Sequence, residues 1–181
     1  MADIATTFGI GDTVPAFAIT DTEGREHVVP APQAPPATVL LETCNHCPYV
    51  VAWNPRLRAV AEEYAPRGVR FLAISSNDVT RHPADSPERM AQFVREQDWP
   101  IPYAYDESQE VARALGAERT PHVFVLDGEQ RLAYRGAPDA DHEDPSQDAA
   151  WLRAALDAIL DGRPVERPET PSRGCTVKWR A

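Results

Sequence analysis

Long apolar runs and a basic leader are both missing from this sequence. No stretch approaches the ~20 apolar residues needed to span a bilayer. The 43% hydrophobic and 25% charged content of the 181 residues is instead typical of a globular soluble chain. We therefore expect no membrane association. The first nine residues, Met1 to Gly9, contain neither a basic nor an apolar segment, so we expect no secretion signal and a cytoplasmic protein.

Positive charge is scarce as well. The chain has 18 basic and 28 acidic residues, a formal net charge of -10 and a pI near 4.9. Every basic residue except Lys178 is an arginine, and the arginines are scattered among carboxylates. A nucleic-acid partner requires a positive patch that offsets phosphate charge. We therefore expect neither nucleic acid nor another acidic molecule as a partner.

Cysteine is limited to Cys44, Cys47 and Cys175. An odd and small number of cysteines does not suit a secreted disulfide scaffold, but it suits a cytosolic protein with a few reactive thiols. The chain length is that of one ordinary domain, and we find no internal repeat. We expect a single domain over residues 1–181, with a Pro-rich C-terminal tail at 162–181 packed on it.

The apolar patterns indicate a chain that alternates strands and helices. A nearly continuous apolar run at 37–42 reads as a buried central strand, followed at once by the cysteine pair and then by a helix from Pro48. With the next strand this forms a βαβ unit. The further predicted elements are a hairpin at 14–30, strands at 69–74, 103–105, 122–126 and 131–134, and helices ending near 67, beginning at Ser86-Pro87, covering 108–115 and carrying 151–159.

The tetrapeptide from Cys44 to Cys47 is the strongest chemical signal. Its position between a strand and a helix start predicts a Cys44 thiolate stabilised by free backbone N–H groups and the helix dipole. Cys47, about one helical turn further on, could resolve a mixed disulfide at Cys44. His46 lies between them and could favour the thiolate, which would make the disulfide comparatively oxidising.

Two other interpretations of this tetrapeptide stay open on residue pattern alone. Cysteines spaced by three residues are often buried structural side chains of a core helix. Zinc binding through Cys44, His46 and Cys47 would need a fourth ligand. A Thr120-Pro121 dipeptide far downstream, directly before a predicted strand, favours redox chemistry, because a cis bond there would leave the Thr120 backbone free to pair with an extended substrate.

The sequence resembles thioredoxin-like proteins of the AhpC/TSA (redoxin) family over nearly its whole length. The heptapeptide Cys44 to Val50 is the most specific element of this resemblance. The other matching segments are Gly11 to Phe17, Ser76 to Asp78, Asp85 to Glu88, Thr120-Pro121, Tyr134 to Gly136 and Gly174 to Trp179.

The resemblance implies an α/β thioredoxin-like fold, in which helices flank a central mixed β-sheet, with an N-terminal β-hairpin extension and an insertion. It also implies a redox-active disulfide between Cys44 and Cys47. Several departures matter. Peroxiredoxins of the usual type have proline and threonine or serine where this chain has Ala37 and Leu41, which argues against direct peroxide reduction. Arg119 replaces a cysteine that is common before the Thr-Pro in this family.

Two further departures concern the surroundings of the thiols. Thr43 stands where thioredoxin has a tryptophan, and Thr38 replaces the buried acid of thioredoxin. Glu42 is then the nearest candidate for a proton acceptor. Asn77 and Asp78 end the strand beside the cysteine-bearing one and either line the site or cap a loop. The other histidines are most simply surface or strand residues.

We predict a thiol-disulfide oxidoreductase in which Cys44 attacks, Cys47 resolves and His46 tunes the pair, with Thr120 and Pro121 positioning the substrate. Asn45, Thr43, Glu42 and Arg119 are the expected supporting residues. The partners would be a disulfide-bearing protein or a small thiol, and an external reductant such as a thioredoxin system. We expect no cofactor and no metal, and the pattern does not address oligomeric state.

Two alternatives differ in chemistry. In a peroxiredoxin-like thiol peroxidase, Cys44 becomes a sulfenic acid and Cys47 or Cys175 condenses with it, with Arg119 polarising the peroxide. A non-catalytic redox sensor or zinc-binding module is the third possibility. Cys175 itself is either a third redox thiol or an anchor of the tail beside Trp179, and packing is the favoured interpretation.

Overall fold

The computed structural model describes residues 8–181. Met1 to Thr7 lie outside this range. The expectation of no secretion signal rests partly on these residues. The strands are β1 (Phe17–Thr20), β2 (Glu26–Val29), β3 (Thr38–Glu42), β4 (Arg70–Ser75), β5 (Tyr103–Tyr105), β6 (Arg119–Thr120), β7 (His122–Leu126), β8 (Leu132–Gly136) and β9 (Cys175–Thr176). The α-helices are α1 (Pro48–Tyr64), α2 (Pro87–Gln97), α3 (Glu110–Leu115) and α4 (Ala150–Leu160).

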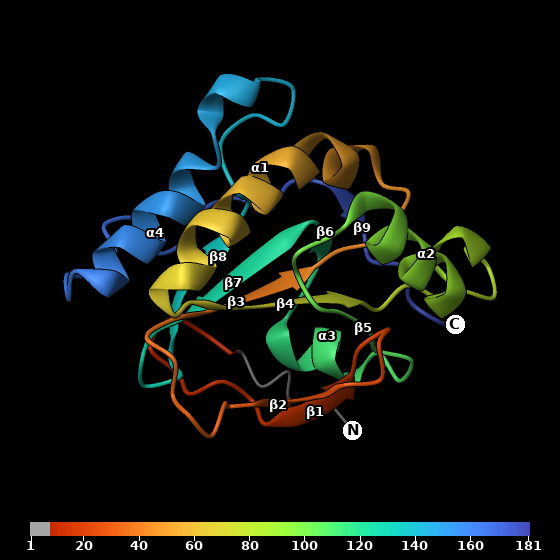
Figure 1. Ribbon diagram of the computed structural model, residues 1–181, viewed down its shortest axis with the longest axis horizontal. Helices are drawn as coiled ribbons and strands as arrows, with labels where there is room; N and C mark the ends of the chain where they lie inside the picture. The colour runs from red at the N-terminus through yellow and green to blue at the C-terminus, as the bar shows by residue number, and fades with distance from the viewer. Residues whose placement is uncertain (1–7) are drawn as a thin grey trace.

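A five-stranded mixed sheet forms the centre of the fold, in the order β5-β4-β3-β7-β8. β3 pairs in parallel with β4 and antiparallel with β7, while β4 pairs in parallel with β5 and β7 antiparallel with β8. Helices α1, α2 and α4 cover one face of the sheet; α3 and the separate β1–β2 hairpin cover the other (Figure 1). The predicted α/β architecture with a mixed sheet and an N-terminal hairpin is confirmed.

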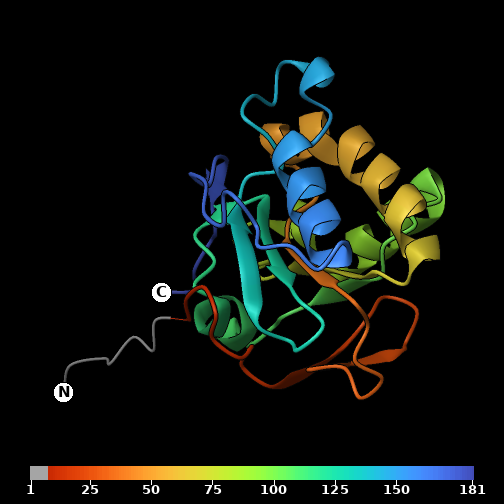
Figure 2. The same cartoon turned by 90° about the vertical axis from the view of Figure 1, so that its left-hand side faces the viewer.

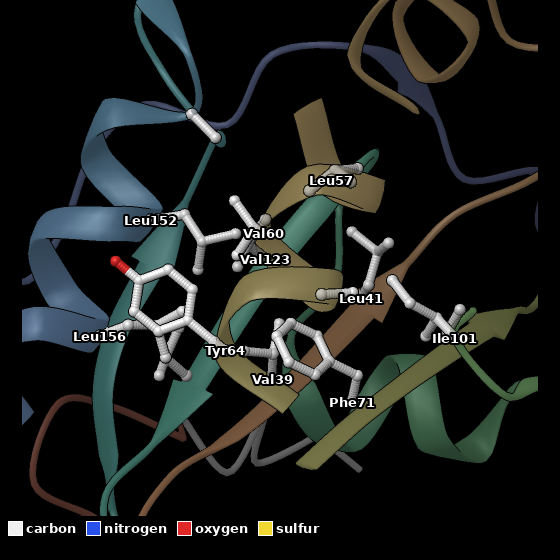
Figure 3. Packing of buried hydrophobic residues seen from close by; sticks show 14 of the residues in the cluster. Val39, Leu41, Leu57, Val60, Tyr64, Phe71, Ile101, Val123, Leu152 and Leu156 are labelled. Atoms are coloured by element: carbon white, nitrogen blue, oxygen red, sulfur yellow. The ribbon is translucent and has the colours of Figure 1, made fainter. Parts of the chain in front are cut away.

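Strand β3 is buried on both faces, as its apolar sequence predicts. Val39 and Leu41 belong to the core beneath α1 and α4, whereas Leu40 belongs to the core beside α3. Successive side chains of a strand point to opposite faces, so a strand covered on both sides needs apolar residues at every position. Figure 3 shows Val39 and Leu41 packed among side chains of α1 and α4, such as Leu57 and Leu156.

The segment between β4 and β5 carries a helix whose ends follow local sequence signals. The Ser86 hydroxyl accepts a hydrogen bond from the Arg89 amide at 3.3 Å, and Pro87 occupies the first helical position of α2. Serine at the N-cap and proline at N1 satisfy or remove amides that have no partner inside the helix. A short 3₁₀ turn, Pro83–Asp85, precedes this cap. That turn brings Asp85 to the end of the sheet where the cysteines lie.

The Pro-rich tail returns from α4 across the sheet edge and then past β6. The Thr170 hydroxyl lies 2.7 Å from the Tyr134 hydroxyl, and the Thr170 amide donates to the Arg135 carbonyl. Further on, β9 pairs antiparallel with β6 near the start of α1 (Figures 1 and 2). The tail therefore contacts the rest of the chain at both its middle and its end. Within residues 8–181, the fold has no helix with the length and apolarity required to cross a bilayer.

Candidate thiol site

The cysteine pair lies in the loop that joins β3 to α1, at one end of the sheet. Cys44 is 3% exposed and Cys47 is fully buried. Helix α1 begins at Pro48, so Cys47 itself is the N-cap residue and its carbonyl accepts from the Val51 amide. The free amides of the first helical turn are therefore nearer to Cys47 than to Cys44.

The pKa values of the two thiols are shifted in opposite directions. The pKa of Cys47 is lowered to about 4, because the Cys44 thiol hydrogen bonds to its sulfur and, more weakly, because Cys175 and the Val50 amide do the same. The pKa of Cys44 is raised by that same hydrogen bond to Cys47, by burial and by the Asp85 carboxylate. Of the two thiols, Cys47 is therefore the more acidic, and the attacking role of Cys44 stays a prediction.

Both sulfurs converge on Thr120 at the end of β6. The Cys44 Sγ lies 3.5 Å from the Thr120 hydroxyl oxygen, and the Cys47 Sγ lies 3.2 Å from the Thr120 carbonyl oxygen. Thr120 is buried, and the peptide bond to Pro121 is cis. The structure thus brings together Cys44, Cys47 and the Thr120-Pro121 dipeptide, residues that lie more than 70 positions apart in the sequence.

The backbone of Thr120 is not free, in contrast to the expectation from the sequence. Strand β9 occupies that edge, with Thr120 opposite Cys175 and Arg119 opposite Thr176. Gly174 permits this approach, because a Cβ added to it would lie 2.0 Å from the Thr120 carbonyl oxygen, and its φ of +150° is also unfavourable for other residues. The edge predicted to receive an extended substrate is therefore covered by the chain's own tail.

The third cysteine reaches the site through this pairing. The Cys175 Sγ lies 2.8 Å from the Cys47 Sγ, and Cys175 is only partly buried. Burial and the contact with Cys47 raise the pKa of Cys175 to about 11. Trp179, its expected packing partner, lies instead against the Arg113 guanidinium at 4.5 Å and the core beside α3. Cys175 is placed for thiol contact, while Trp179 anchors the tail elsewhere.

His46 binds a buried carboxylate that the sequence analysis did not single out. The His46 Nδ1 lies 2.8 Å from the Asp85 Oδ2, with the His46 side chain 40% exposed and that of Asp85 fully buried. The Asp85 carboxylate also accepts from the Asn45 amide at 2.8 Å and the Asn77 side-chain amide at 2.9 Å. Asp85 thus ties the cysteine loop to the end of β4. It belongs to a segment of the family resemblance, but no local pattern indicated its contact with His46.

The same residues form a possible cation site. Ligand atoms of Cys44, His46 and Asp85 all lie within 4.8 Å of one another. This set differs from the sequence-based one, because Asp85 replaces Cys47. Three ligands and a water form a common open zinc arrangement, so a metal-binding protein remains a chemically distinct interpretation of this corner.

Glu42, the expected proton acceptor, lies in a different network. Its buried carboxylate accepts from the Ser76 amide at 3.1 Å and the Ser76 hydroxyl at 3.2 Å, and burial raises its pKa well above the usual value. Ser76 in turn donates to Asp106. Glu42 shares its strand face with Leu40, on the side of α3. Among the described residues its hydrogen-bond partners include neither cysteine, so we assign the proton-accepting role elsewhere.

The remaining predicted supporting residues hold the loops around the thiols. The Asn45 side chain donates to the Ala84 carbonyl at 2.9 Å and accepts from the Tyr103 hydroxyl at 3.0 Å. The Thr43 amide donates to the Ile74 carbonyl at 2.8 Å. The Arg119 guanidinium lies 3.4 Å from the Gly174 carbonyl oxygen and therefore contacts the tail.

Asn77 and Asp78 line this corner in separate ways. The Asn77 Oδ1 accepts a hydrogen bond from the Lys178 backbone amide at 2.8 Å, and the Asn77 Nδ2 donates one to Asp85. Asp78 instead caps its own loop, because its carboxylate accepts from the Thr80 amide and hydroxyl. Asn77 therefore lines the site, whereas Asp78 caps a loop.

Comparison with solved structures places the fold among thioredoxin-like proteins. A peroxidoxin from Mycobacterium tuberculosis, BcpB, matches with a TM-score of 0.60 and 20% identity, covering 84% of this chain and 96% of that one. A thiol:disulfide interchange protein of the thioredoxin family from Chlorobium tepidum matches with a TM-score of 0.61 and 16% identity, covering 78% and 96%. At these identities the likeness concerns the fold.

The chain belongs to the AhpC/TSA family, whose model matches residues 10–135. An uncharacterized conserved protein from Geobacillus kaustophilus is 40% identical, with a TM-score of 0.88 and coverage of 97% of this chain and 94% of that one. A hypothetical protein from Sinorhizobium meliloti is 35% identical, with a TM-score of 0.89 and 97% coverage of both chains. No curated protein matches the sequence significantly.

Proposed function

We propose that this protein is a thiol-disulfide oxidoreductase that cycles Cys44 and Cys47 between dithiol and disulfide. The observation that carries the proposal is the convergence of both sulfurs on Thr120. Membership of the AhpC/TSA family supports a redox enzyme in general. The whole chain would act as one thioredoxin-like domain, with residues 162–181 packed on it.

The first step is attack by Cys44 on a substrate disulfide. Cys47 is the more acidic thiol of a hydrogen-bonded pair, so in its thiolate form it accepts the Cys44 proton as the Cys44 sulfur attacks. One S–S bond of the substrate breaks, a mixed disulfide forms at Cys44, and one substrate sulfur leaves as a thiolate. Cys47 thus takes the role of proton acceptor for which Glu42 was the sequence-based candidate.

The second step is resolution by Cys47. Its proton passes to the departed substrate thiolate, and the regenerated Cys47 thiolate attacks the Cys44 sulfur. The mixed disulfide breaks, a Cys44–Cys47 disulfide forms, and the second substrate sulfur leaves. An external thiol reductant then returns the pair to the dithiol.

His46 and Asp85 lie beside Cys44, on the side of the cysteine pair that faces the solvent. The half-exposed imidazole lies between the solvent and the buried carboxylate, where a protonated His46 would offset the repulsion between Asp85 and a Cys44 thiolate. A reduced pair that is favoured in this way corresponds to a comparatively oxidising disulfide. We propose His46 as the residue that tunes the potential and Asp85 as the residue that positions it.

Direct peroxide reduction is the second candidate, supported by the family match alone. Leu41 and Ala37, which replace the hydroxyl-bearing residue and the proline of usual peroxiredoxins, are both buried in the core under α1. Neither offers a polar atom to a peroxide. Arg119, the candidate for polarising peroxide, is engaged with the Gly174 carbonyl of the tail.

Stopped-flow kinetics separates these reactions. Reduced wild-type protein is mixed either with a small-molecule disulfide or with hydrogen peroxide, and the loss of thiol is followed. We expect rapid exchange with the disulfide and slow reaction with peroxide, with exchange lost in Cys44→Ser and arrested at a mixed disulfide in Cys47→Ser. Fast peroxide consumption with negligible exchange would support the peroxidase instead. Inertness toward both oxidants, together with stoichiometric zinc in the purified protein, would support the binding module.

A further inference from the structure

Cys175 and Cys44 are both sulfur partners of Cys47. The Cys175 Sγ lies 2.8 Å from the Cys47 Sγ, whereas a disulfide bond is about 2.0 Å long. Cys47 is also hydrogen bonded to the Cys44 thiol. A small approach of two sulfurs already in contact would therefore be enough to join Cys175 to Cys47.

The tail is held at this position by contacts on both sides of Cys175. Gly174 passes against the Thr120 carbonyl, and the Val177 amide donates to the Glu118 carbonyl at 3.1 Å. Beyond these, the Lys178 amide donates to the Asn77 side chain, and its carbonyl accepts from the Asp78 amide at 2.8 Å and the Gln109 side chain at 3.0 Å. The placement of Cys175 therefore rests on several backbone contacts of its own strand.

We propose that Cys175 is an internal exchange partner of the Cys44–Cys47 disulfide, which it converts into a Cys47–Cys175 disulfide. This inference rests on the function proposed above and assigns the tail a role in it. The Cys175 thiolate attacks the Cys47 sulfur, the bond between Cys47 and Cys44 breaks, and the electron pair leaves on Cys44. The proton that Cys175 loses is taken up by Cys44 through solvent. The step is redox-neutral and needs no further oxidant.

The electrostatics of Cys175 favour this order of events. After burial, the hydrogen bond and the charge of Cys47 are the next causes that raise its pKa, while Lys178 and Arg119 lower it. Once Cys47 enters a disulfide it carries no charge. The thiol of Cys175 then becomes more acidic, with the two cations still beside it. Formation of the first disulfide thus activates the thiol that attacks it.

The consequence is a change in which thiol remains free after oxidation. With a Cys44–Cys47 disulfide the free thiol is Cys175; after the internal exchange it is Cys44. The new disulfide also links β9 covalently to the start of α1, over the Thr120 edge that β9 already covers. The oxidised protein would then present a disulfide at the partly exposed Cys175 and release Cys44 for another attack.

Peptide mapping of the singly oxidised protein tests this inference. Trypsin cleavage after Arg25, Arg56, Arg173 and Lys178 places Cys44 and Cys47 together in peptide 26–56 and Cys175 in peptide 174–178. The protein is oxidised with a limiting small-molecule disulfide, quenched in acid, denatured, and labelled with N-ethylmaleimide. We expect the two peptides to be disulfide-linked and the label to lie on Cys44. A label on Cys175, with an internal disulfide in peptide 26–56, would overturn the inference.

Variants identify the residues and separate the two proposals. The link should be absent in both Cys44→Ser and Cys47→Ser, because the internal exchange starts from the Cys44–Cys47 disulfide and ends on the Cys47 sulfur; a link that forms equally well in Cys44→Ser would mean that the internal exchange is not its source. Gly174→Ala should reduce the linked fraction by at least about tenfold, because its Cβ would meet the Thr120 carbonyl. Thr176→Ala, at an exposed neighbouring position, should leave the linked fraction unchanged.

If Cys175→Ser exchanges normally and the wild type never forms the link, the internal exchange fails and the proposed function stands. If neither protein exchanges with the disulfide, the proposed function itself fails.

Discussion

Two buried aspartates, Asp139 and Asp85, each accept several hydrogen bonds, but their ionisable partners differ. Asp139 has a permanent cation as its partner: the buried Arg56 guanidinium lies 2.8 Å from its carboxylate, and the Trp53 indole and the Ala149 amide also donate to it. Within residues 8–181, the hydrogen-bond and ion-pair partners of Asp85 include no arginine or lysine. Its ionisable partner is the half-exposed imidazole of His46.

The two pairs also differ in their exposure to solvent and in their distance from the thiols. The Arg56–Asp139 pair joins α1 to the loop after β8 and is closed to the solvent, so its charges are fixed. The Asp85–His46 pair adjoins Cys44 and opens to the solvent through His46. We interpret Asp139 as a structural anchor and Asp85 as a positioning residue of the redox site.

The largest expected effect is on stability, at Asp139. Replacing one partner of a buried ion pair leaves the other charge uncompensated, which typically costs about 3–5 kcal/mol. We therefore expect Asp139→Asn to lower the free energy of unfolding by that amount in guanidinium titrations. The exchange rate per folded molecule should stay within about twofold of the wild type, since distant sites are nearly independent. The double variant Arg56→Met/Asp139→Leu should recover only part of the loss, because the Trp53 indole and the Ala149 amide then lack their acceptor; no recovery at all would show that the uncompensated charge is not the main cost.

A second prediction extends the comparison to histidine. His122 is buried, unlike His46, and burial and Arg135 lower its pKa to about 4. Because the folded pKa lies below the ordinary value of about 6.5, the unfolded state binds the proton first, and stability is lost as pH falls from 6.5 through 4. The full contribution is about 3 kcal/mol. Unfolding titrations at pH 7 and pH 4.5 should show a smaller acid loss in His122→Gln than in the wild type. Equal acid losses in both proteins would contradict a neutral buried His122.

The third prediction concerns Asp85 and is smaller in energy. Asp85→Asn should cost about 1–2 kcal/mol of stability, the usual range for a weakened buried hydrogen bond. It should also lower the pKa of Cys44, because the Asp85 carboxylate is one cause of its rise. A fall of about one unit would raise the rate of Cys44 alkylation by iodoacetamide at pH 7 about tenfold. Asp78→Asn removes a neighbouring carboxylate that caps its own loop and serves as the control. Identical alkylation in both variants would break the contrast drawn between Asp85 and Asp139.

The elements that carry the cysteines could be predicted because their signals are local. β3 is a continuous apolar run, and α1 shows helical spacing at Trp53 and Leu57 after Pro48. The cysteines follow the strand directly, so the strand-to-helix position of the pair is a property of neighbouring residues. The same holds for the Ser86 cap of α2.

The parts that could not be predicted depend on packing between distant segments. Asp85 meets the Asn45 amide across 40 positions, and only the turn before α2 brings them together. Strand β9 is two residues long and follows a Pro-rich segment that reads as a connector. Its pairing with Thr120 depends on the close approach of Gly174. The N-cap position of Cys47 was also not predicted, because it depends on the helix beginning at Pro48, immediately after Cys47.

The central claim is that Cys44 and Cys47 form one exchange couple in which Cys44 attacks first. Its most direct test is mass spectrometry of a trapped intermediate in the Cys47→Ser/Cys175→Ser protein after mixing with a small-molecule disulfide. We predict one stable mixed disulfide per molecule, located at Cys44, and rapid loss of the same adduct when Cys47 is restored. A protein without an adduct at Cys44, or an adduct that persists unchanged after Cys47 is restored, would contradict the claim.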